Sequence, residues 1–338
     1  MEDRSKNLMS LCSEMNFGKV GLSGKEKEFC RRFNNEIILL CKSLPKSSHA
    51  DAILFFMKYL GAPIGRELNF FANYYAPSWS IIYWLIQSCP DERRLSGADI
   101  NSAVSAHSMA LLLHPLDDHL NDGQLPATHL HLLLRSQSWM VMHAALEHLS
   151  NGIDGGAQLV KLFIDSYYEN ICDSEEIECI EKYCERFRKQ MATWLIVPVL
   201  LAKKLAPDED FSSAIQRAYG SFGIAWRLMD DIRDIETDMI NGNHSAIYVS
   251  LPENQRKLWD HYPEDKSDQR SEAAGMILDY LLQNRVIDRL RRKICSELES
   301  AASQVEAYAL TRLADEFRGL LAPLINGQFI YEKVYGWQ

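Results

Sequence analysis

The chain has 338 residues, 47% of them apolar and 24% charged, so it is neither disordered nor a small disulfide-bonded protein. Its 36 Lys and Arg against 46 Asp and Glu give a net charge of −10, which argues against a nucleic-acid partner. The apolar runs are all shorter than the about 20 residues that a membrane span needs. The first residues lack a signal-peptide core and the cysteines form no CxxC pair. We therefore expect a cytoplasmic protein with reduced thiols.

Helical patterns follow one another almost without a gap, and no segment shows the two-residue alternation of a strand. Ser23 with Glu26 and Ser96 with Asp99 have the spacing of a helix start. Pro115 should end the helix that it enters, because proline lacks the amide donor. The expected helices span 23–43, 50–60, 78–88, 96–114, 126–149, 156–171, 174–205 and 208–239, with two or three more after them.

This order of helices predicts an all-α bundle. A single domain is expected over 1–338. Within it, residues 1–22 are expected to be flexible. Residues 252–271 are polar and are expected to form an irregular loop.

Two groups of aspartates are embedded in apolar helical sequence. The first cluster is Asp117, Asp118 and Asp122, although Asn121 competes with Asp122 for the last position. The second cluster comprises four residues, which are Asp230, Asp231, Asp234 and Asp238. Three of these recur every four residues and would share one helix face. Carboxylates so crowded repel one another unless a cation neutralises them, and oxygen ligands of this kind suit Mg²⁺. The plainer interpretation of either cluster is a solvated acidic face.

With both clusters in view, the chain resembles the class I isoprenoid enzymes, the trans-prenyltransferases and terpene synthases. This resemblance implies that the all-α bundle is of the class I terpenoid and isoprenyl synthase type. Asp117-Asp118-x-x-x-Asp122 is similar to their first aspartate-rich motif, and Tyr219 to Asp234 resembles the second motif with its lead-in. The tail from Asp238 to Pro252 is similar to the loop that closes the second motif. The likeness covers about Asp99 to Pro252, and one such motif alone would be weak.

The resemblance implies a site in which three Mg²⁺ ions bridge both clusters and the diphosphate of an allylic substrate. All seven aspartates would bind metal. Arg227 or Arg233 would pair with the diphosphate, because the guanidinium fork reaches two phosphate oxygens. Aromatic and apolar side chains would surround the carbocation. We expect these to be Leu112, Leu113, Phe222 and Trp226, with Trp79, Tyr83 and Trp84 opposite; core packing is the alternative.

Departures from the family pattern bear on the reaction. Elongating members carry basic or polar groups for a second diphosphate at five places. Here those places read Gly61 to Arg66, Gly123 to His129, Gln190, Arg227 and Asn243. Few counter-charges remain, which favours a terpene synthase that cyclises or rearranges one C15 or C20 prenyl diphosphate. The alternatives are a short-chain trans-prenyl diphosphate synthase and, less favoured, a non-catalytic helical partner subunit. A homodimer is left open.

Overall fold

The computed structural model describes residues 2–59, 69–71, 73–89, 95–121, 123–171, 177–206, 208–262 and 269–326. No strand occurs in these ranges, so the prediction of an all-α fold is confirmed. The helices are α1 (Glu2–Glu14), α2 (Gly24–Ser43), α3 (His49–Tyr59), α4 (Pro77–Gln87), α5 (Gly97–Asn121), α6 (His129–Ser150), α7 (Gly156–Ile171), α8 (Ile180–Gln190), α9 (Ala192–Leu205), α10 (Glu209–Arg233), α11 (Ile235–Asn241), α12 (Ala246–Val249), α13 (Glu253–His261), α14 (Gln269–Gln283), α15 (Val286–Glu306) and α16 (Thr311–Asn326), with a 3₁₀ turn at Lys46–Ser48.

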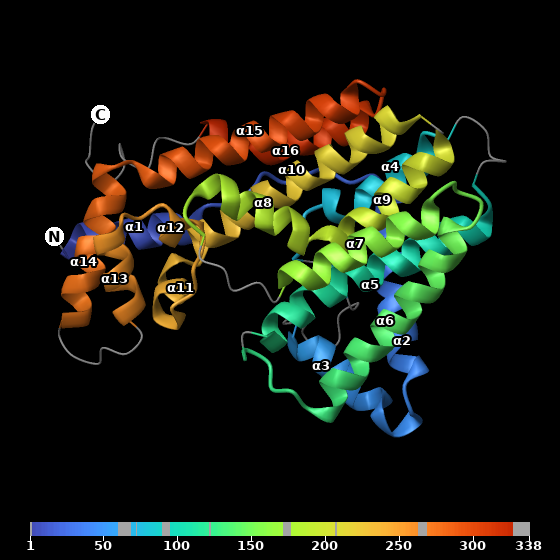
Figure 1. Ribbon diagram of the computed structural model, residues 1–338, viewed down its shortest axis with the longest axis horizontal. Coiled ribbons are helices and arrows are strands. Elements are labelled where there is room, and N and C mark those ends of the chain that lie inside the picture. The colour runs from blue at the N-terminus through green and yellow to red at the C-terminus, as the bar shows by residue number, and fades with distance from the viewer. Residues whose placement is uncertain are drawn as a thin grey trace.

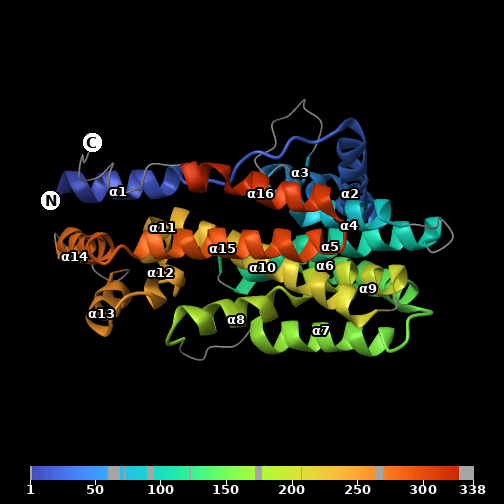
Figure 2. The same cartoon turned by 90° about the horizontal axis from the view of Figure 1, so that it is seen from above.

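The long helices α5, α9 and α10 lie at the centre of the bundle (Figure 1). α10 packs between α9 and α15, while α5 packs along α6 and also contacts α9. Figure 2 shows α1 and α16 along one face and α7 and α8 along the opposite face. The two helices that carry the acidic clusters, α5 and α10, are therefore enclosed by others, as the apolar residues before each cluster predict.

Local sequence explains several helix starts. The Ser23 hydroxyl accepts the Glu26 amide while the Glu26 carboxylate accepts the Ser23 amide, which is the predicted capping box. Ser96 and Asp99 form the same pair of bonds at the start of α5. Each box satisfies amides that the first helical turn would otherwise leave without an acceptor.

Two predicted long helices are broken. The helix expected over 174–205 is two helices that meet at Met191. A Cβ at Gly223 of α10 would lie 2.2 Å from the Met191 sulfur, so glycine leaves the room in which this side chain packs. The helix expected over 208–239 ends as α10 at Arg233, and Asp234 joins it to α11.

Two segments that were expected to be flexible or irregular contain helices. Residues 1–22, expected to be flexible, contain α1, whose Leu8 and Cys12 are buried. The predicted irregular loop over 252–271 is wrong for Glu253–His261, which forms α13 around the buried Trp259. The cysteines of the described part are free thiols. Among its helices, none has the length and apolarity to cross a membrane.

Pro115 does not end α5, contrary to the sequence prediction. Proline cannot donate to the Leu111 carbonyl one turn earlier, so a helix would normally lose that bond. Here the Tyr74 hydroxyl donates to the Leu111 carbonyl at 2.8 Å. A side chain thus replaces the missing backbone donor, and α5 continues through the first cluster to Asn121.

Candidate active site

The first cluster is built around Asp117, whose side chain is 3% exposed. Arg135 of α6 donates to both of its carboxylate oxygens, with Nε at 2.5 Å from Oδ1 and an Nη at 3.2 Å from Oδ2. The Tyr167 hydroxyl of α7 donates to Oδ2 at 2.8 Å. Both oxygens are therefore occupied, and the bidentate arginine fixes the plane of the carboxylate.

The second cluster repeats this arrangement at Asp231, which is 2% exposed. The Tyr183 hydroxyl of α8 and the Ala246 amide donate to its Oδ2 at 2.7 and 2.9 Å. Arg227 lies one turn earlier on α10 and places Nε 3.0 Å from Oδ1. Its Nε also donates to the Tyr183 hydroxyl at 2.9 Å, which closes a ring of three polar side chains.

The other carboxylates of the second cluster are less well compensated. Burial raises the pKa of Asp230 to about 6, and Asp231 and Asp234 add to the rise while Arg227 opposes it. Burial and the Asp231 charge raise the pKa of Asp238 to about 7, against the hydrogen bond that the Asn243 amide donates to its carboxylate. Burial also raises the pKa of Asp234, which is more exposed. These raised pKa values indicate that the carboxylates of the second cluster bring together more negative charge than the neighbouring side chains neutralise.

The break at Asp234 leaves the register of these side chains intact. The Asp234 amide donates to the Asp230 carbonyl at 2.9 Å, and the Asp238 amide donates to the Asp234 carbonyl at 2.8 Å. These are the four-residue steps of an α-helix, so the one-face spacing predicted from the sequence is kept across the junction.

The two clusters lie within electrostatic reach of each other. The charge of Asp118 on α5 acts on Arg227 of α10, and both act on the ring of His114 between them. His119, the residue after Asp118, contacts α3 instead, with its Nδ1 2.7 Å from the Tyr59 hydroxyl. The structure therefore brings the two clusters to one region of the bundle.

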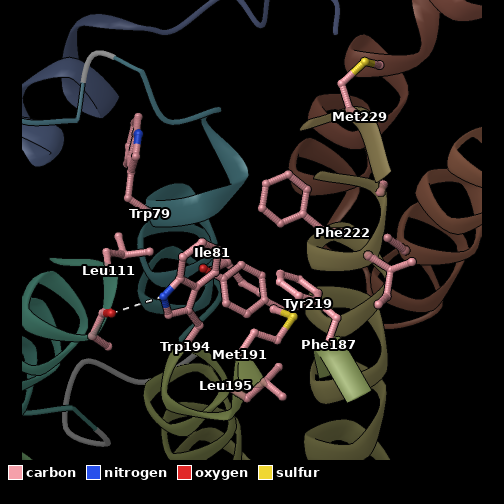
Figure 3. Packing of buried hydrophobic residues seen from close by; sticks show 14 of the residues in the cluster. Trp79, Ile81, Leu111, Phe187, Met191, Trp194, Leu195, Tyr219, Phe222 and Met229 are labelled. Carbon is pink, nitrogen blue, oxygen red and sulfur yellow. Dashed lines mark hydrogen bonds between the residues drawn. The ribbon is translucent and has the colours of Figure 1, made fainter. Parts of the chain in front are cut away.

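An aromatic wall lies beside the clusters and contains the predicted Trp226. The Trp226 ring is 5.6 Å from Trp194 of α9 and 6.3 Å from Phe187 of α8. The Arg227 guanidinium lies 5.7 Å from the centre of the Phe187 ring. Trp194 is fixed by its indole, which donates to the Ala110 carbonyl of α5 at 3.1 Å, the dashed bond in Figure 3.

Several other predicted lining residues are packed among neighbouring side chains. Phe222 is fully buried and stacks on Tyr219 on the inner side of α10 (Figure 3). Trp79 and Leu113 are also enclosed by the hydrophobic core. Tyr83 packs against Phe29 of α2 and against Trp84.

Trp84 faces a different cavity, of about 400 Å³, which lies between the segment before α2 and helix α16. Its indole donates to Glu316 at 2.6 Å, and the Ser80 hydroxyl donates to the same carboxylate. Burial raises the pKa of Glu316 to about 7, the two donors lower it, and Glu26 raises it further. The structure thus separates Trp84 from the acidic clusters.

A small apolar cavity lies under the first cluster. It measures about 20 Å³, room for roughly one water molecule, and is lined mainly by rings from α3 and the segment before α4. Leu112 is the predicted residue that reaches it. The complete lining is Ile37, Phe56, Tyr59, Phe70, Phe71, Tyr74, Leu112 and Pro115.

Two further predictions concern Arg233 and Asp122. Arg233 lies close to Tyr75, where burial raises the pKa of the hydroxyl and the arginine charge opposes the rise. Its Nε is buried with no partner in the part of the chain that is described. Asp122 lies outside the described residues, so the choice between it and the exposed Asn121 stays a prediction.

The two clusters offer carboxylate oxygens of the kind that Mg²⁺ prefers. Within the described ranges, no group of three His, Cys, Asp or Glu side chains is placed to hold a metal ion unaided. Asp118, Asp230 and Asp234 receive no side-chain hydrogen bond from described residues, and two of them have raised pKa values. Mg²⁺ binds through one or two carboxylates, waters and substrate phosphates, so this donor set fits an ion shared with a diphosphate.

Sequence reasoning missed the groups that hold the clusters in place. In the sequence, Arg135 stands out only as the first arginine after the first aspartate-rich motif. Tyr167 and Tyr183 lie 50 and 48 residues from the aspartates that they contact. The only signal for each tyrosine is a polar tip on the apolar face of an amphipathic helix.

Comparisons with known proteins were made at the level of sequence and of structure. No family model matches the sequence, and no curated protein matches it. Among solved structures, the chain is similar to the geranylgeranyl pyrophosphate synthetase of Pyrococcus horikoshii, with a TM-score of 0.63 and 12% identity over 90% of this chain and 98% of that one. The Geoglobus acetivorans geranylgeranyl pyrophosphate synthetase gives a TM-score of 0.62 and 17% identity over 86% and 98%.

A third similar structure is the polyprenyl synthase of Caulobacter crescentus, complexed with calcium and isoprenyl diphosphate. It gives a TM-score of 0.58 and 12% identity over 94% of this chain and 98% of that one. At such low identity these likenesses establish the fold. The fold is that of the trans-prenyltransferase type of class I isoprenoid enzymes, as the sequence resemblance predicts.

Proposed function

Because the chain has the fold of the prenyl diphosphate synthases, we propose that it ionises an allylic prenyl diphosphate with loss of diphosphate. The observation that carries the proposal is the approach of two acidic clusters, each anchored by an arginine, next to an aromatic wall. A diphosphate leaves only when its developing negative charge is neutralised.

Asp118, Asp230 and Asp234 would hold magnesium, which when bound supplies that neutralisation. Three ions remain the expected number. Asp117 and Asp231, whose oxygens are already occupied, would hold Arg135 and Arg227 in position. Arg227 is 29% exposed, so part of its fork is free to meet a phosphate oxygen.

Trp226, Trp194 and Phe187 would keep water from the allylic cation and stabilise it through their ring faces. The cavity of about 20 Å³ is far smaller than the 300–1,000 Å³ of small-molecule sites, so a prenyl chain has to separate the rings that line it. The C15 or C20 length of the substrate stays a prediction.

Two fates of the cation are considered. Prenyl transfer to isopentenyl diphosphate is the fate that the fold comparisons favour, because the similar structures are named as prenyl diphosphate synthases. Cyclisation or rearrangement of a single substrate is the second candidate. It is supported by residues at places where elongating relatives carry groups for a second diphosphate.

These residues are engaged within the protein. The Gln190 amide donates to the Asn170 carbonyl at 3.1 Å, the Asn243 amide donates to Asp238 at 3.2 Å, and Arg227 pairs with Asp231. The stretch Gly61 to Arg66 lies outside the described residues. Holding a second diphosphate requires positively charged side chains. The described places therefore supply few of the positive charges that such a group needs.

Incubation with labelled isopentenyl diphosphate, an unlabelled allylic diphosphate and Mg²⁺ separates the two fates. Label in longer prenyl diphosphates would establish prenyl transfer. Pyrophosphate release with unused label and a hydrocarbon or alcohol product would establish the single-substrate reaction. Absence of pyrophosphate release from C10, C15 and C20 substrates would contradict the proposed ionisation itself and favour a non-catalytic partner subunit.

A further inference from the structure

A buried histidine lies between the two clusters and belongs to neither. His114 of α5 precedes Asp117 by three residues and is 7% exposed. Its Nδ1 is buried and makes no hydrogen bond within the described part of the protein. Most buried polar atoms in folded proteins have a partner, so an imidazole nitrogen left free in this position requires an explanation.

The surroundings of His114 are aromatic on one side and charged on the other. The ring packs against the ring of Trp194 at 5.0 Å and that of Phe187 at 5.9 Å, both in edge-on geometry. Charges from both clusters act on it, namely those of Asp117, Asp118 and His119 on α5 and that of Arg227 on α10. Burial lowers the pKa of His114, with Asp118 opposing it, which favours the neutral ring.

His107 provides a comparison on the same helix. It is fully buried, and its Nδ1 likewise has no partner among the described residues, but its Nε2 lies 2.7 Å from the Ser78 carbonyl and 3.3 Å from the Tyr219 hydroxyl. That ring links α4, α5 and α10 inside the core. His114 has no such hydrogen bond among the described residues, so a structural link does not explain it.

The other polar groups around the clusters have assigned partners or tasks. Asp117 and Asp231 are occupied by arginine and tyrosine donors, and Tyr167 and Tyr183 already donate their hydroxyl protons. Asp118 and Asp230 are the proposed metal ligands. The His114 imidazole packs directly on two rings of the aromatic wall, and its Nδ1 has no hydrogen-bond partner among the described residues. It is therefore a neutral side-chain base next to the rings that are proposed to enclose the allylic cation.

On the basis of the proposed function, we infer that His114 is the base that removes the proton with which the carbocation reaction ends. The C–O bond breaks first and its electron pair leaves with the diphosphate. A C–H bond next to the cationic carbon then breaks, and its electron pair forms a C=C bond. The proton goes to the free imidazole nitrogen, and the imidazolium returns it to solvent after the product leaves. The step applies whether the cation has been cyclised or has been extended.

The test measures how tightly pyrophosphate release is coupled to alkene formation. Wild type, His114→Gln, His114→Phe and the control His107→Gln are incubated with Mg²⁺ and C10, C15 or C20 diphosphates, with and without isopentenyl diphosphate. The readout is the amount of proton-loss product, hydrocarbon or longer prenyl diphosphate, per pyrophosphate released. Circular dichroism confirms the fold of each variant.

In the His114 variants we expect pyrophosphate release to fall by about twofold to fivefold and the coupling ratio to fall at least fivefold. Water-trapped alcohol should replace the lost alkene. His107→Gln should keep the wild-type ratio. A wild-type ratio in both folded His114 variants overturns the inference while leaving the proposed function intact. A wild-type chain that releases no pyrophosphate from any substrate overturns the proposed function, and the role of His114 with it.

Discussion

The two acidic clusters use the same three kinds of group but assemble them differently. In each cluster, a buried aspartate accepts from a tyrosine hydroxyl and pairs with an arginine. At Asp117 both partners come from other helices, α6 and α7. At Asp231 the arginine comes from the same helix, and the Ala246 amide adds a backbone donor.

This difference shows that one chemical arrangement can be reached by long-range or by local contacts. The second cluster is partly encoded in one helix, since Arg227 and Asp231 are four residues apart and share a face. The first exists only after α5, α6 and α7 have packed. We therefore expect the first cluster to depend more strongly on tertiary structure than the second.

The largest expected effect is on catalysis at the second cluster. Asp230→Asn should lower pyrophosphate release at least 100-fold, because one charge that would hold the metal is lost. The matched control is Glu236→Gln, an exposed acid of α11 close to the cluster. Release rates and circular dichroism are measured for both. Near wild-type release in Asp230→Asn would remove this residue from the metal site.

Arginine removal tests the comparison through stability. Arg135→Ala and Arg227→Ala each leave a buried aspartate without its counter-charge, which costs about 3 kcal/mol in the free energy of unfolding. Asp231 keeps the Ala246 amide and Tyr183, so Arg227→Ala should cost less than Arg135→Ala. Urea unfolding measures both values. The opposite order would show that the local cluster is the more dependent one.

A third buried carboxylate, Glu316, has no arginine among its described partners. It can be compared with Asp117 and Asp231, which each pair with an arginine. Its raised pKa of about 7 means that the folded protein holds the proton which the unfolded chain releases near its ordinary value of 4.5. The stability from this group is therefore present below about pH 4.5 and is lost as pH rises through 7.

Glu316→Gln removes this dependence, because the amide does not titrate. Relative to wild type, the variant should gain roughly 2 kcal/mol in unfolding free energy between pH 5 and pH 8. Unfolding in urea at both pH values provides the measurement. A difference between variant and wild type that stays constant with pH would show that Glu316 is already ionised at pH 5.

The smallest expected effects come from the tyrosines. Tyr167→Phe and Tyr183→Phe each remove one hydroxyl donor from a buried carboxylate, at about 1–2 kcal/mol. Tyr183→Phe also removes one of the two acceptors of the Arg227 Nε and leaves only the Asp231 carboxylate, so it should lower pyrophosphate release more than Tyr167→Phe does. Equal losses of activity would indicate that Arg227 keeps its position without this hydroxyl.

The sequence predicts most of the fold because helix starts and helix faces are local properties. Ser23 and Glu26 encode the start of α2 within four residues. The breaks at Met191 and Asp234 are missed, since nothing within one helical turn shows that Gly223 leaves space for the Met191 side chain. α13 is missed because its mostly polar sequence buries a single large ring, that of Trp259.

For the site, the same limit separates the aspartates from their partners. The spacing of Asp230, Asp234 and Asp238 is visible along the chain, and the structure keeps it. That Trp226 faces Trp194 depends on how α9 crosses α10, and periodicity within either helix does not fix that crossing. The sequence therefore predicts that aromatic side chains line the site. Which aromatic residues do so depends on how the helices pack.

The Tyr74 hydroxyl that caps the Leu111 carbonyl has a consequence for motion. In an ordinary helical turn, each carbonyl accepts a hydrogen bond from a backbone amide of the same helix, and the bond breaks only when the turn unwinds. Here the Leu111 carbonyl accepts from the Tyr74 side chain, which lies outside the helix. Amide hydrogen exchange can detect the difference. Loss of the hydroxyl in Tyr74→Phe should speed exchange at the amides around Pro115 while leaving those early in α5 slow. We therefore expect the turn that presents Asp117 and Asp118 to have a local opening equilibrium of its own, set by a residue more than forty positions earlier in the chain.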